Sequence, residues 1–407
     1  MHLDRLLLAF RIPVYRWLWA SNLTEATGFM PFMLAQGWVI LEITDSPFMV
    51  GLAPGLGGIA NMLFSPFGGV LVDRFNRRTI LMLAQIIMAA AILILGLLFI
   101  SGLIEVWHIL IISMIQRTMM GLQLTARNTL MYNLVGPKVF MNAMAGQFMS
   151  VHIATIIGPL AAGFILAAFG AGPLFLVISS VIFLSAILLL PVPSGPRTER
   201  PAGSVWLNLR EGISFAMGDR SIRTVMWTVL ITDGLGYSSW SMFPVVTREI
   251  LDAGPVVLGL LATFLGVGGL IGTLALSSFG DFKPKGQVFI GAAFCFGAFL
   301  VLFAFSRSLP LSLALILLTG ASASTYDILA HTLLMRLTPD AMRGRVMGLY
   351  AFLMSGISLG SLALGTVASW LGVKWALTGS GSIIATNALS VTPMAQTLSE
   401  TSALKTE

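Results

Sequence analysis

Long apolar stretches without a single Asp, Glu, Lys or Arg recur along this chain, and they limit the folds that it can adopt. They are residues 46–72, 79–104, 139–196, 253–280, 286–306, 346–373 and 375–399. A helix needs about 20 mostly apolar residues to cross the roughly 30 Å hydrocarbon core of a bilayer. Each stretch is long enough for one such helix, and residues 139–196 are long enough for two. The sequence therefore predicts an all-α membrane protein.

Composition supports this prediction and excludes other classes. Charged residues make up only 10% of the 407 residues, against about 25% in soluble domains, so they are too few to cover a soluble globule. The single cysteine, Cys295, excludes a disulfide framework and a multi-cysteine metal site. The net charge of +6 comes from dispersed basic residues rather than one basic face, so no nucleic-acid partner is expected.

Spans that contain one interrupting charge complete the set and give twelve predicted transmembrane helices. Their ranges are 17–41, 47–72, 79–101, 106–132, 141–168, 173–192, 221–247, 254–279, 286–306, 309–335, 342–371 and 374–392. An eleven-helix chain stays open as the alternative, because polar residues such as Thr378, Ser382 and Asn387 dilute the last span. The predicted domains are an N-terminal six-helix bundle (1–192), a cytoplasmic linker (193–219), a C-terminal six-helix bundle (220–395) and a cytoplasmic tail (396–407).

The distribution of basic residues predicts the orientation of these helices. With a cytoplasmic N-terminus, 19 of the 23 Lys and Arg residues fall in inner segments, three fall in outer loops, and Arg117 lies within a span. Cytoplasmic loops carry an excess of Lys and Arg. We therefore expect a multi-pass plasma-membrane protein with both termini in the cytoplasm.

The two halves of the chain resemble each other. A shift of 202 residues aligns Pro137, Gly146, Gly158, Gly163 and Gly170 with proline or glycine residues of the second half. A shift of 208 residues aligns Asp73 with Asp281 and Glu25 with Asp233. Many transporters are built from internal repeats, so this pattern predicts two pseudo-symmetric bundles that enclose a cavity.

Several motifs resemble those of the major facilitator superfamily. The segment from Gly69 to Arg78, G-V-L-V-D-R-F-N-R-R, matches the G-x-L-x-D-[RK]-x-x-x-[RK] loop of that family, with Asn76 at a position that is usually glycine. Arg117 to Gly121 resembles the R-x-x-x-G motif of proton-coupled members, although Met120 replaces a polar residue. The resemblance implies a transporter that works by alternating access and needs no cofactor.

Two further segments point to one branch of this superfamily. Gly158, Pro159 and Gly163 resemble a helix-five motif associated with antiporters, with Ala162 where a second glycine is common. Residues 339–348, together with Phe10-Arg11 and Tyr15 to Trp19, resemble the bacterial branch that contains macrolide and enterobactin exporters. This similarity implies export of a small molecule in exchange for protons.

Charged residues at the inner ends of the helices are predicted to form a cytoplasmic gate. An acid between basic residues adds nothing to membrane topology, so Asp73 has another expected role. We predict that it faces the N-terminal end of helix eleven, where helix dipole and unpaired N–H groups favour an anion. The predicted gate residues are Gly69, Asp73, Arg74, Arg77, Arg78, Asp281, Lys283, Arg343 and Arg345.

Four ionisable residues interrupt the spans, and they are the main candidates for coupling. Glu25, Arg117, Asp233 and Asp327 each lie nine or ten residues from the nearest basic residue at the predicted inner end of the helix, which is roughly 13 to 15 Å. We therefore predict that all four share one depth. Charges in the membrane are costly and are functional candidates by default. Arg117 is predicted to be the counter-ion or proton-switch partner of a carboxylate, and a buried ion pair that only fixes helix packing is the alternative.

Other polar and aromatic residues lie on the same helices. His331 follows Asp327 by one helical turn and is expected either to pair with it or to lie near the inner interface. Aromatic walls suit amphipathic or cationic solutes. The remaining predicted cavity residues are Gln36, Trp38, Tyr237, Trp240 and Tyr326, and packing is the alternative role for each.

These observations predict a proton-driven exporter of a small amphipathic compound, such as a drug or siderophore-like molecule, that works as a monomer. The alternatives are a nutrient symporter or facilitator and a lipid flippase. An enzyme is not expected, because the sequence has no nucleophile and base set, and His108, His152 and His331 lie in different segments. A nucleotide-driven pump is disfavoured, since no G-x-x-x-x-G-K-[ST] loop is present.

Overall fold

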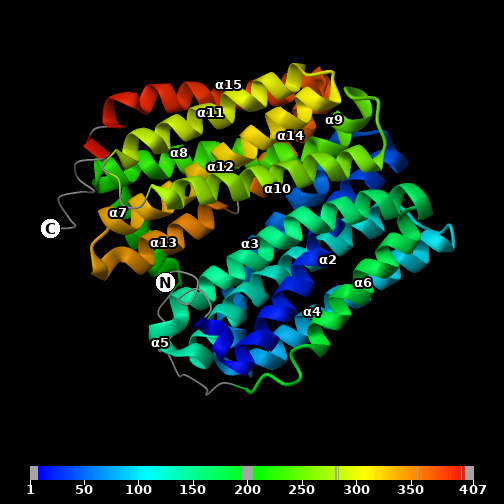
Figure 1. Ribbon diagram of the computed structural model, residues 1–407, viewed down its shortest axis with the longest axis horizontal. Helices are drawn as coiled ribbons and strands as arrows, with labels where there is room; N and C mark the ends of the chain where they lie inside the picture. The colour runs from blue at the N-terminus through cyan, green and yellow to red at the C-terminus, as the bar shows by residue number, and fades with distance from the viewer. Residues whose placement is uncertain are drawn as a thin grey trace. The chain divides into compact units, whose positions relative to one another are not determined.

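The computed structural model describes residues 8–194, 205–279, 282, 284–354, 356–395, 397 and 398. Within these ranges, the described side chains exclude those of residues 65–74, 138, 205–209, 340, 341 and 356. The described backbone is helical almost throughout and contains no strand (Figure 1). The predicted all-α class is therefore confirmed.

The first half of the chain forms one short 3₁₀ helix and five α-helices. They are η1 (Ala9–Arg11), α2 (Pro13–Thr44), α3 (Pro47–Arg74), α4 (Arg77–Ile100), α5 (Val106–Phe169) and α6 (Ala171–Ile187). Pro13 begins α2, where its missing N–H leaves no hydrogen bond unmade. Asn76 caps α4, because its side chain accepts a hydrogen bond of 3.1 Å from the Arg78 N–H. The residue that departs from the superfamily motif thus starts a helix.

The second half is cut into more segments. They are α7 (Val205–Gly218), α8 (Arg220–Gly236), η2 (Tyr237–Met242), α9 (Phe243–Glu249), α10 (Pro255–Ser278), α11 (Lys285–Phe305), α12 (Leu309–Leu337), α13 (Asp340–Met354), α14 (Gly356–Leu371), α15 (Val373–Val391) and η3 (Thr392–Met394). Predicted helix seven corresponds to α8, η2 and α9 together, and predicted helix eleven to α13 and α14. Each of the twelve predicted spans coincides with one or more helices.

Nine spans within the described residues are long and apolar enough to cross a membrane. The other three predicted spans are shorter or more polar: α6 has 17 residues, helix seven is broken, and α15 carries the polar residues noted in the sequence. Many of the side chains that the spans expose are large and apolar, such as Leu63, Phe169 and Trp370. A bilayer solvates such side chains directly.

Helix α5 is two predicted spans joined at a kink. Gly136 has φ 71° and ψ 169°, outside the helical region, and Pro137 follows it. Glycine tolerates a positive φ that other residues rarely adopt, and proline cannot donate to the preceding helix. The predicted break between residues 132 and 141 therefore falls at Gly136, nine residues beyond Arg127.

Contacts between Cα atoms divide the chain into two compact units. Unit 1 contains residues 1–45, 56–202 and 254–263, and unit 2 contains residues 46–55, 203–253 and 264–407. In unit 1, α2 packs on α5 and α6, and α4 packs on the same two helices. In unit 2, α11 packs between α12 and α15, and α14 contacts α8 and α15; Figure 1 shows α11 and α15 side by side.

Paired glycines allow close helix packing in each unit. In unit 2, a Cβ atom on Gly51 would lie 2.9 Å from the Cα atom of Gly365. In unit 1, a Cβ atom on Gly163 would lie 3.2 Å from the Cα atom of Gly259. The offsets of 208 and 202 residues that relate the two halves convert one pair into the other. Small residues let membrane helices approach closely, so the internal repeat extends to matching backbone contacts.

Aromatic residues near the start of α2 join it to the second part of α5. The Tyr15 hydroxyl donates to the Ala143 carbonyl at 2.8 Å, and the Trp19 indole donates to the Gly146 carbonyl at 2.8 Å. The Phe10 ring packs edge-on against both aromatic rings. The motif that resembled macrolide and enterobactin exporters is thus an anchor between helices.

The glycine contacts predict a position-dependent cost of adding one methyl group. Gly163→Ala places a Cβ atom 2.7 Å from the Pro255 carbonyl oxygen, and overpacking of this kind costs about 1–3 kcal/mol. Gly291→Ala is the control, since nothing lies within 4 Å of the added Cβ atom. Thermal unfolding in detergent should show a lower midpoint for Gly163→Ala alone. Equal midpoints for the two variants would contradict this packing.

Candidate functional site

Glu25 of α2 forms a buried ion pair in unit 1. Arg127 of α5 donates to the Glu25 Oε2 atom and also to the Asn22 Oδ1 atom. Glu25 and Arg127 are both 8% exposed, and Asn22 is 4% exposed. The acid that interrupts the first span is therefore neutralised by an arginine on a neighbouring helix.

Amide and hydroxyl groups complete the environment of this pair. Gln85 of α4 donates to Glu25 Oε2 at 2.9 Å and to Ser21 Oγ at 3.3 Å. The Gln123 amide, with its nitrogen turned toward Glu25, donates to Glu25 Oε2 at 2.9 Å. Asn22 donates to Ser150 Oγ. We call Glu25, Arg127, Asn22, Gln85 and Gln123 the Glu25 network; it ties α2, α4 and α5 together.

Arg117 does not lie at the level of Glu25, because Arg127 of the same helix pairs with that acid. Its predicted role as partner of a carboxylate stays a prediction. The inner end of its helix segment is at Gly136 rather than at Arg127, so Arg127 itself reaches the level of Glu25. Ten residues separate Arg117 from Arg127, which is about 15 Å of helix. Arg117 lies that much closer to the Val106 end of α5. Its hydrogen bond within the described residues goes from Nη2 to the Met33 Sδ atom at 3.6 Å.

The R-x-x-x-G motif of α5 packs against glycine and asparagine on α3. A Cβ atom on Gly57 would lie 2.7 Å from Arg117 Cγ, and one on Gly121 would lie 2.3 Å from Asn61 Oδ1. Arg117 and Gly121 are one turn apart, as are Gly57 and Asn61, so the two helices match turn by turn. Met120, which departs from the family motif, is 39% exposed and lies outside this seam.

The surroundings of Asp233 in α8 differ from those of Glu25, although the internal repeat makes the two positions equivalent. Asp233 is fully buried, and neither of its carboxylate oxygens has a hydrogen-bond partner among the described residues. The Asp327 carboxyl group and the Tyr326 hydroxyl, both of α12, lie close enough to interact electrostatically with Asp233. The Tyr326 hydroxyl is also buried and has no hydrogen-bond partner there. Among the described residues of unit 2, no cation faces this carboxyl group, and the Tyr326 hydroxyl, the nearby donor, does not complete a hydrogen bond to it.

Asp327 has a different donor from the one predicted. The Tyr350 hydroxyl of α13 donates to Asp327 Oδ1 at 2.6 Å. The His331 ring stands edge-on to the Tyr350 ring, with centroids 6.0 Å apart. His331 has no hydrogen bond to Asp327 among the described residues, but the two side chains lie close enough to interact electrostatically. Sequence spacing could not reveal Tyr350, a donor 23 residues away.

Aromatic rings surround this pair of acids. The Tyr237 ring lies edge-on to the Trp240 ring at 4.5 Å and to the Phe296 ring at 5.8 Å. Asp233 and Asp327 both interact electrostatically with Tyr237. The Tyr326 ring stacks on Phe289 at 5.3 Å. We call Asp233, Asp327, Tyr237, Tyr326 and Tyr350 the acid cluster.

Gln36 and Trp38, also predicted to line a cavity, lie on α2 in unit 1. Gln36 is 6% exposed and its Oε1 atom has no hydrogen-bond partner in the described region. Trp38 is partly exposed. Neither residue joins the Glu25 network.

The predicted gate is described only in part. The side chains of Gly69, Asp73 and Arg74, and both Asp281 and Lys283, lie outside the described residues. Arg77 is buried at the start of α4, and the Arg78 N–H bonds to Asn76. The gate therefore stays a prediction.

Arg343 and Arg345 make contacts within unit 2. Arg343 Nε donates to the Met335 carbonyl at 3.2 Å. Arg345 Nε lies 2.9 Å from Glu211 Oε2, and both side chains are 38% exposed. Gly212 is equally close to α13, since a Cβ atom there would lie 2.8 Å from the Arg345 carbonyl oxygen. These contacts fasten the linker helix α7 to α13.

The predicted antiporter motif forms a packing surface on α5. A Cβ atom on Gly158 would lie 2.9 Å from Pro31 Cδ of α2. The Pro159 carbonyl oxygen would lie 2.6 Å from a Cβ atom on Gly259. Gly158, Pro159 and Gly163 thus bring α5 close to two other segments of unit 1.

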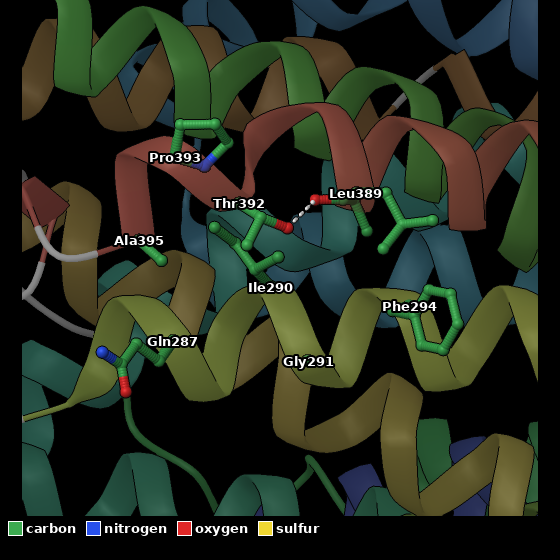
Figure 2. A pocket seen from close by; sticks show the side chains of 9 residues that line it. Gln287, Ile290, Gly291, Phe294, Leu389, Thr392, Pro393 and Ala395 are labelled. Carbon is green, nitrogen blue, oxygen red and sulfur yellow. Dashed lines mark hydrogen bonds between the residues drawn. The ribbon is translucent and has the colours of Figure 1, made fainter.

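A cavity of about 460 Å³ lies elsewhere in unit 2, between α11 and the end of α15. Figure 2 shows Gln287, Ile290 and Phe294 on one side and Leu389 and Pro393 on the other. The Thr392 hydroxyl is turned to its own helix, where it donates to the Ala388 carbonyl at 3.2 Å. The lining carries no ionisable side chain, so this cavity offers nothing that exchanges a proton. Among the described residues, no group of three or more His, Cys, Asp or Glu side chains could hold a metal ion.

Known proteins resemble the chain over most of its length. A family described as transmembrane secretion effector matches residues 6–406. Macrolide efflux protein A of Streptococcus pyogenes is 23% identical over 377 residues, 90% of this chain and 92% of the relative. Enterobactin exporter EntS of Shigella flexneri is 25% identical over 334 residues, 80% of this chain and 78% of the relative. The crystal structure of the nucleoside transporter NupG (D323A mutant) has a TM-score of 0.73 and 14% identity, and the match covers 94% of this chain and 99% of that one.

The Glu25 network predicts a large difference between two arginines of α5. Arg127→Met leaves Glu25 buried without its counter-ion, and breaking such a pair costs about 3–5 kcal/mol. Arg117→Met strands no carboxylate among the described residues, so its effect on the free energy of unfolding should be smaller. Adding Glu25→Gln to Arg127→Met should recover part of the loss. Denaturant unfolding in detergent measures all three; equal losses for the two arginine variants would refute the assignment.

Proposed function

This chain belongs to the transmembrane secretion effector family of the major facilitator superfamily, and on that premise we propose that it exports a small amphipathic compound in exchange for protons. It is a multi-pass membrane transporter and not an enzyme. The names of its efflux relatives support export as the direction. The bound cargo would be released outside as protons enter.

The isolation of Asp233 is the observation that supports proton coupling. A carboxylate buried without hydrogen bonds or a counter-ion is very costly, whereas the neutral acid is much less so. Both Asp233 oxygens are in this situation. We therefore infer that Asp233 holds a proton in the described conformation and loses it when a conformational change brings water or a cationic group to the carboxyl.

Asp327 supplies a second acid with a different environment. It is partly exposed and accepts a hydrogen bond from Tyr350, which stabilises its charged form. Two negative charges at one site repel each other, so ionising both acids is unfavourable. Asp233 and Asp327 lie close enough to interact electrostatically. When Asp327 is ionised, its charge thus favours a proton on Asp233. In this proposal the proton moves between the acid cluster and solvent, and the Glu25 network keeps its charge.

Tyr237 of the acid cluster and the neighbouring Trp240 support an amphipathic cargo. Tyr237 and Trp240 are partly exposed and form an edge-on pair, and the Trp240 N–H is buried with no hydrogen-bond partner among the described residues. Apolar walls with a few polar groups are typical of small-molecule sites. We propose that this face of unit 2 contacts the apolar part of the cargo.

The remaining features of the proposal follow from topology. We propose a plasma-membrane location with both termini in the cytoplasm, since basic residues concentrate in the predicted inner segments. We also propose that the chain works as a monomer and requires no cofactor besides the proton gradient.

Asp233→Asn should abolish transport driven by a pH gradient. Proteoliposomes with an imposed gradient would be tested with amphipathic dyes of cationic, zwitterionic and anionic charge, and proton flux would be recorded with a pH-sensitive dye. Asp252→Asn is the control, because it makes the same change at a turn between α9 and α10. Asp233→Asn should retain dye exchange without a gradient.

Four results would contradict the proposal. Unchanged gradient-driven transport by Asp233→Asn would remove Asp233 from the mechanism. Cargo that moves in the same direction as the protons would indicate a symporter, and transport without any gradient dependence would indicate a facilitator. Movement of a fluorescent lysophospholipid in place of the dyes would indicate a flippase.

A further inference from the structure

Arg117 is a cation within a membrane-spanning helix whose described neighbours supply no carboxylate. Its hydrogen bond there is the one to the Met33 thioether, and a thioether sulfur is a weak acceptor. Arg127, ten residues along the same helix, is matched by Glu25 and Asn22. A charge in the hydrocarbon region is unfavourable even on insertion scales. Arg117 therefore retains unused donors at a position where a cation is costly.

The Arg117 side chain lies beside a partly exposed part of α2. Arg117 and Met33 are both partly exposed. On α2, Met33 belongs to a stripe of partly exposed residues at helical spacing, with Ala26, Met30 and Gly37. Helical positions three or four apart share one face. Arg117 thus reaches the open face of α2 and not its buried face, which carries Glu25.

Two glycines shape the seam beside Arg117. The Arg117 side chain lies against Gly57, where a Cβ atom would come within 2.7 Å of its Cγ atom. One turn along both helices, Gly121 leaves room for Asn61, whose Oδ1 atom is buried without a hydrogen-bond partner in the described region. A buried amide oxygen without a hydrogen-bond donor is destabilising. The seam therefore offers a cation and, one turn away, an acceptor without a donor.

We propose that Arg117 binds a carboxylate, or an equivalent planar oxyanion, carried by the transported compound. The cargo class is then anionic or zwitterionic amphiphiles, an inference that rests on the proposed transport function and specifies its substrate. The planar guanidinium presents N–H donors in a fork that matches a carboxylate. A lipid phosphate does not fit, because Arg117 is 11 residues from the start of α5, about 16 Å into the span.

A pair of probes that differ only in charge tests this assignment. Purified full-length protein in nanodiscs would be titrated calorimetrically with 4-phenylbutyrate and with its neutral amide, 4-phenylbutyramide. The wild type should bind the carboxylate at least about tenfold more tightly, because hydrogen bonds to charged groups are the stronger ones. Arg117→Gln should weaken carboxylate binding roughly 10- to 100-fold and leave amide binding unchanged.

Two further variants keep the test independent of folding. Arg307→Gln makes the same charge change at an exposed position between α11 and α12 and should bind both probes as the wild type does. Gly57→Ala keeps the charge but displaces the Arg117 side chain, so it should weaken the carboxylate and spare the amide. Unchanged amide binding shows in each case that the protein is folded.

Equal affinities for the two probes in the wild type would overturn the inference. So would a carboxylate preference that survives Arg117→Gln, or complete displacement of the carboxylate by equimolar chloride, which would indicate an adventitious anion only. Calorimetry uses no gradient, so its result is separate from proton coupling. If the wild type shows no carboxylate preference but its gradient-driven transport depends on Asp233, this inference alone is refuted. If the carboxylate preference is present but gradient-driven transport survives Asp233→Asn, the proposed coupling alone is refuted.

Discussion

The cost of holding an ionised side chain inside a bilayer determines how this protein is organised. Few charges interrupt its spans, and each is resolved differently. Glu25 is neutralised by Arg127 and surrounded by the amides of Gln85 and Gln123. Asp327 accepts a hydrogen bond from Tyr350, and Asp233 has no donor among the described residues. Because replacing water by an apolar environment penalises charge far more than a neutral acid, these surroundings separate a structural carboxylate from one suited to exchange a proton.

The internal repeat makes this separation informative. Glu25 and Asp233 are equivalent in sequence, and the glycine pairs Gly51–Gly365 and Gly163–Gly259 show that equivalence persists in backbone packing. The two acids nevertheless have opposite environments. Unit 1 places an arginine beside its acid, and unit 2 places a second acid and three tyrosines there. One half thus keeps a fixed ion pair as part of its packing, and the other keeps the groups that we assign to coupling.

The sequence predicted the helices well and the pairing of charges poorly, for a physical reason. Charge-free apolar length is set directly by bilayer thickness, so every predicted span has a helical counterpart. The depth of a charge depends on where its helix ends. Without the kink at Gly136, Arg127 is interpreted as an end residue and Arg117 as a charge at the level of Glu25. Asn22, Gln85 and Gln123 were missed because they are uncharged, although polar groups in apolar spans need partners. Tyr350 was missed because its contact with Asp327 is tertiary.

The infrared carbonyl band of a protonated carboxylic acid reports which acid holds a proton, and so it tests whether Asp233 is protonated while Glu25 is ionised. Spectra of the wild type, Asp233→Asn and Glu25→Gln would be compared in the same lipid at neutral pH. We expect a protonated-acid band in the wild type that disappears in Asp233→Asn and persists in Glu25→Gln. A band that persists in Asp233→Asn and disappears in Glu25→Gln would contradict it.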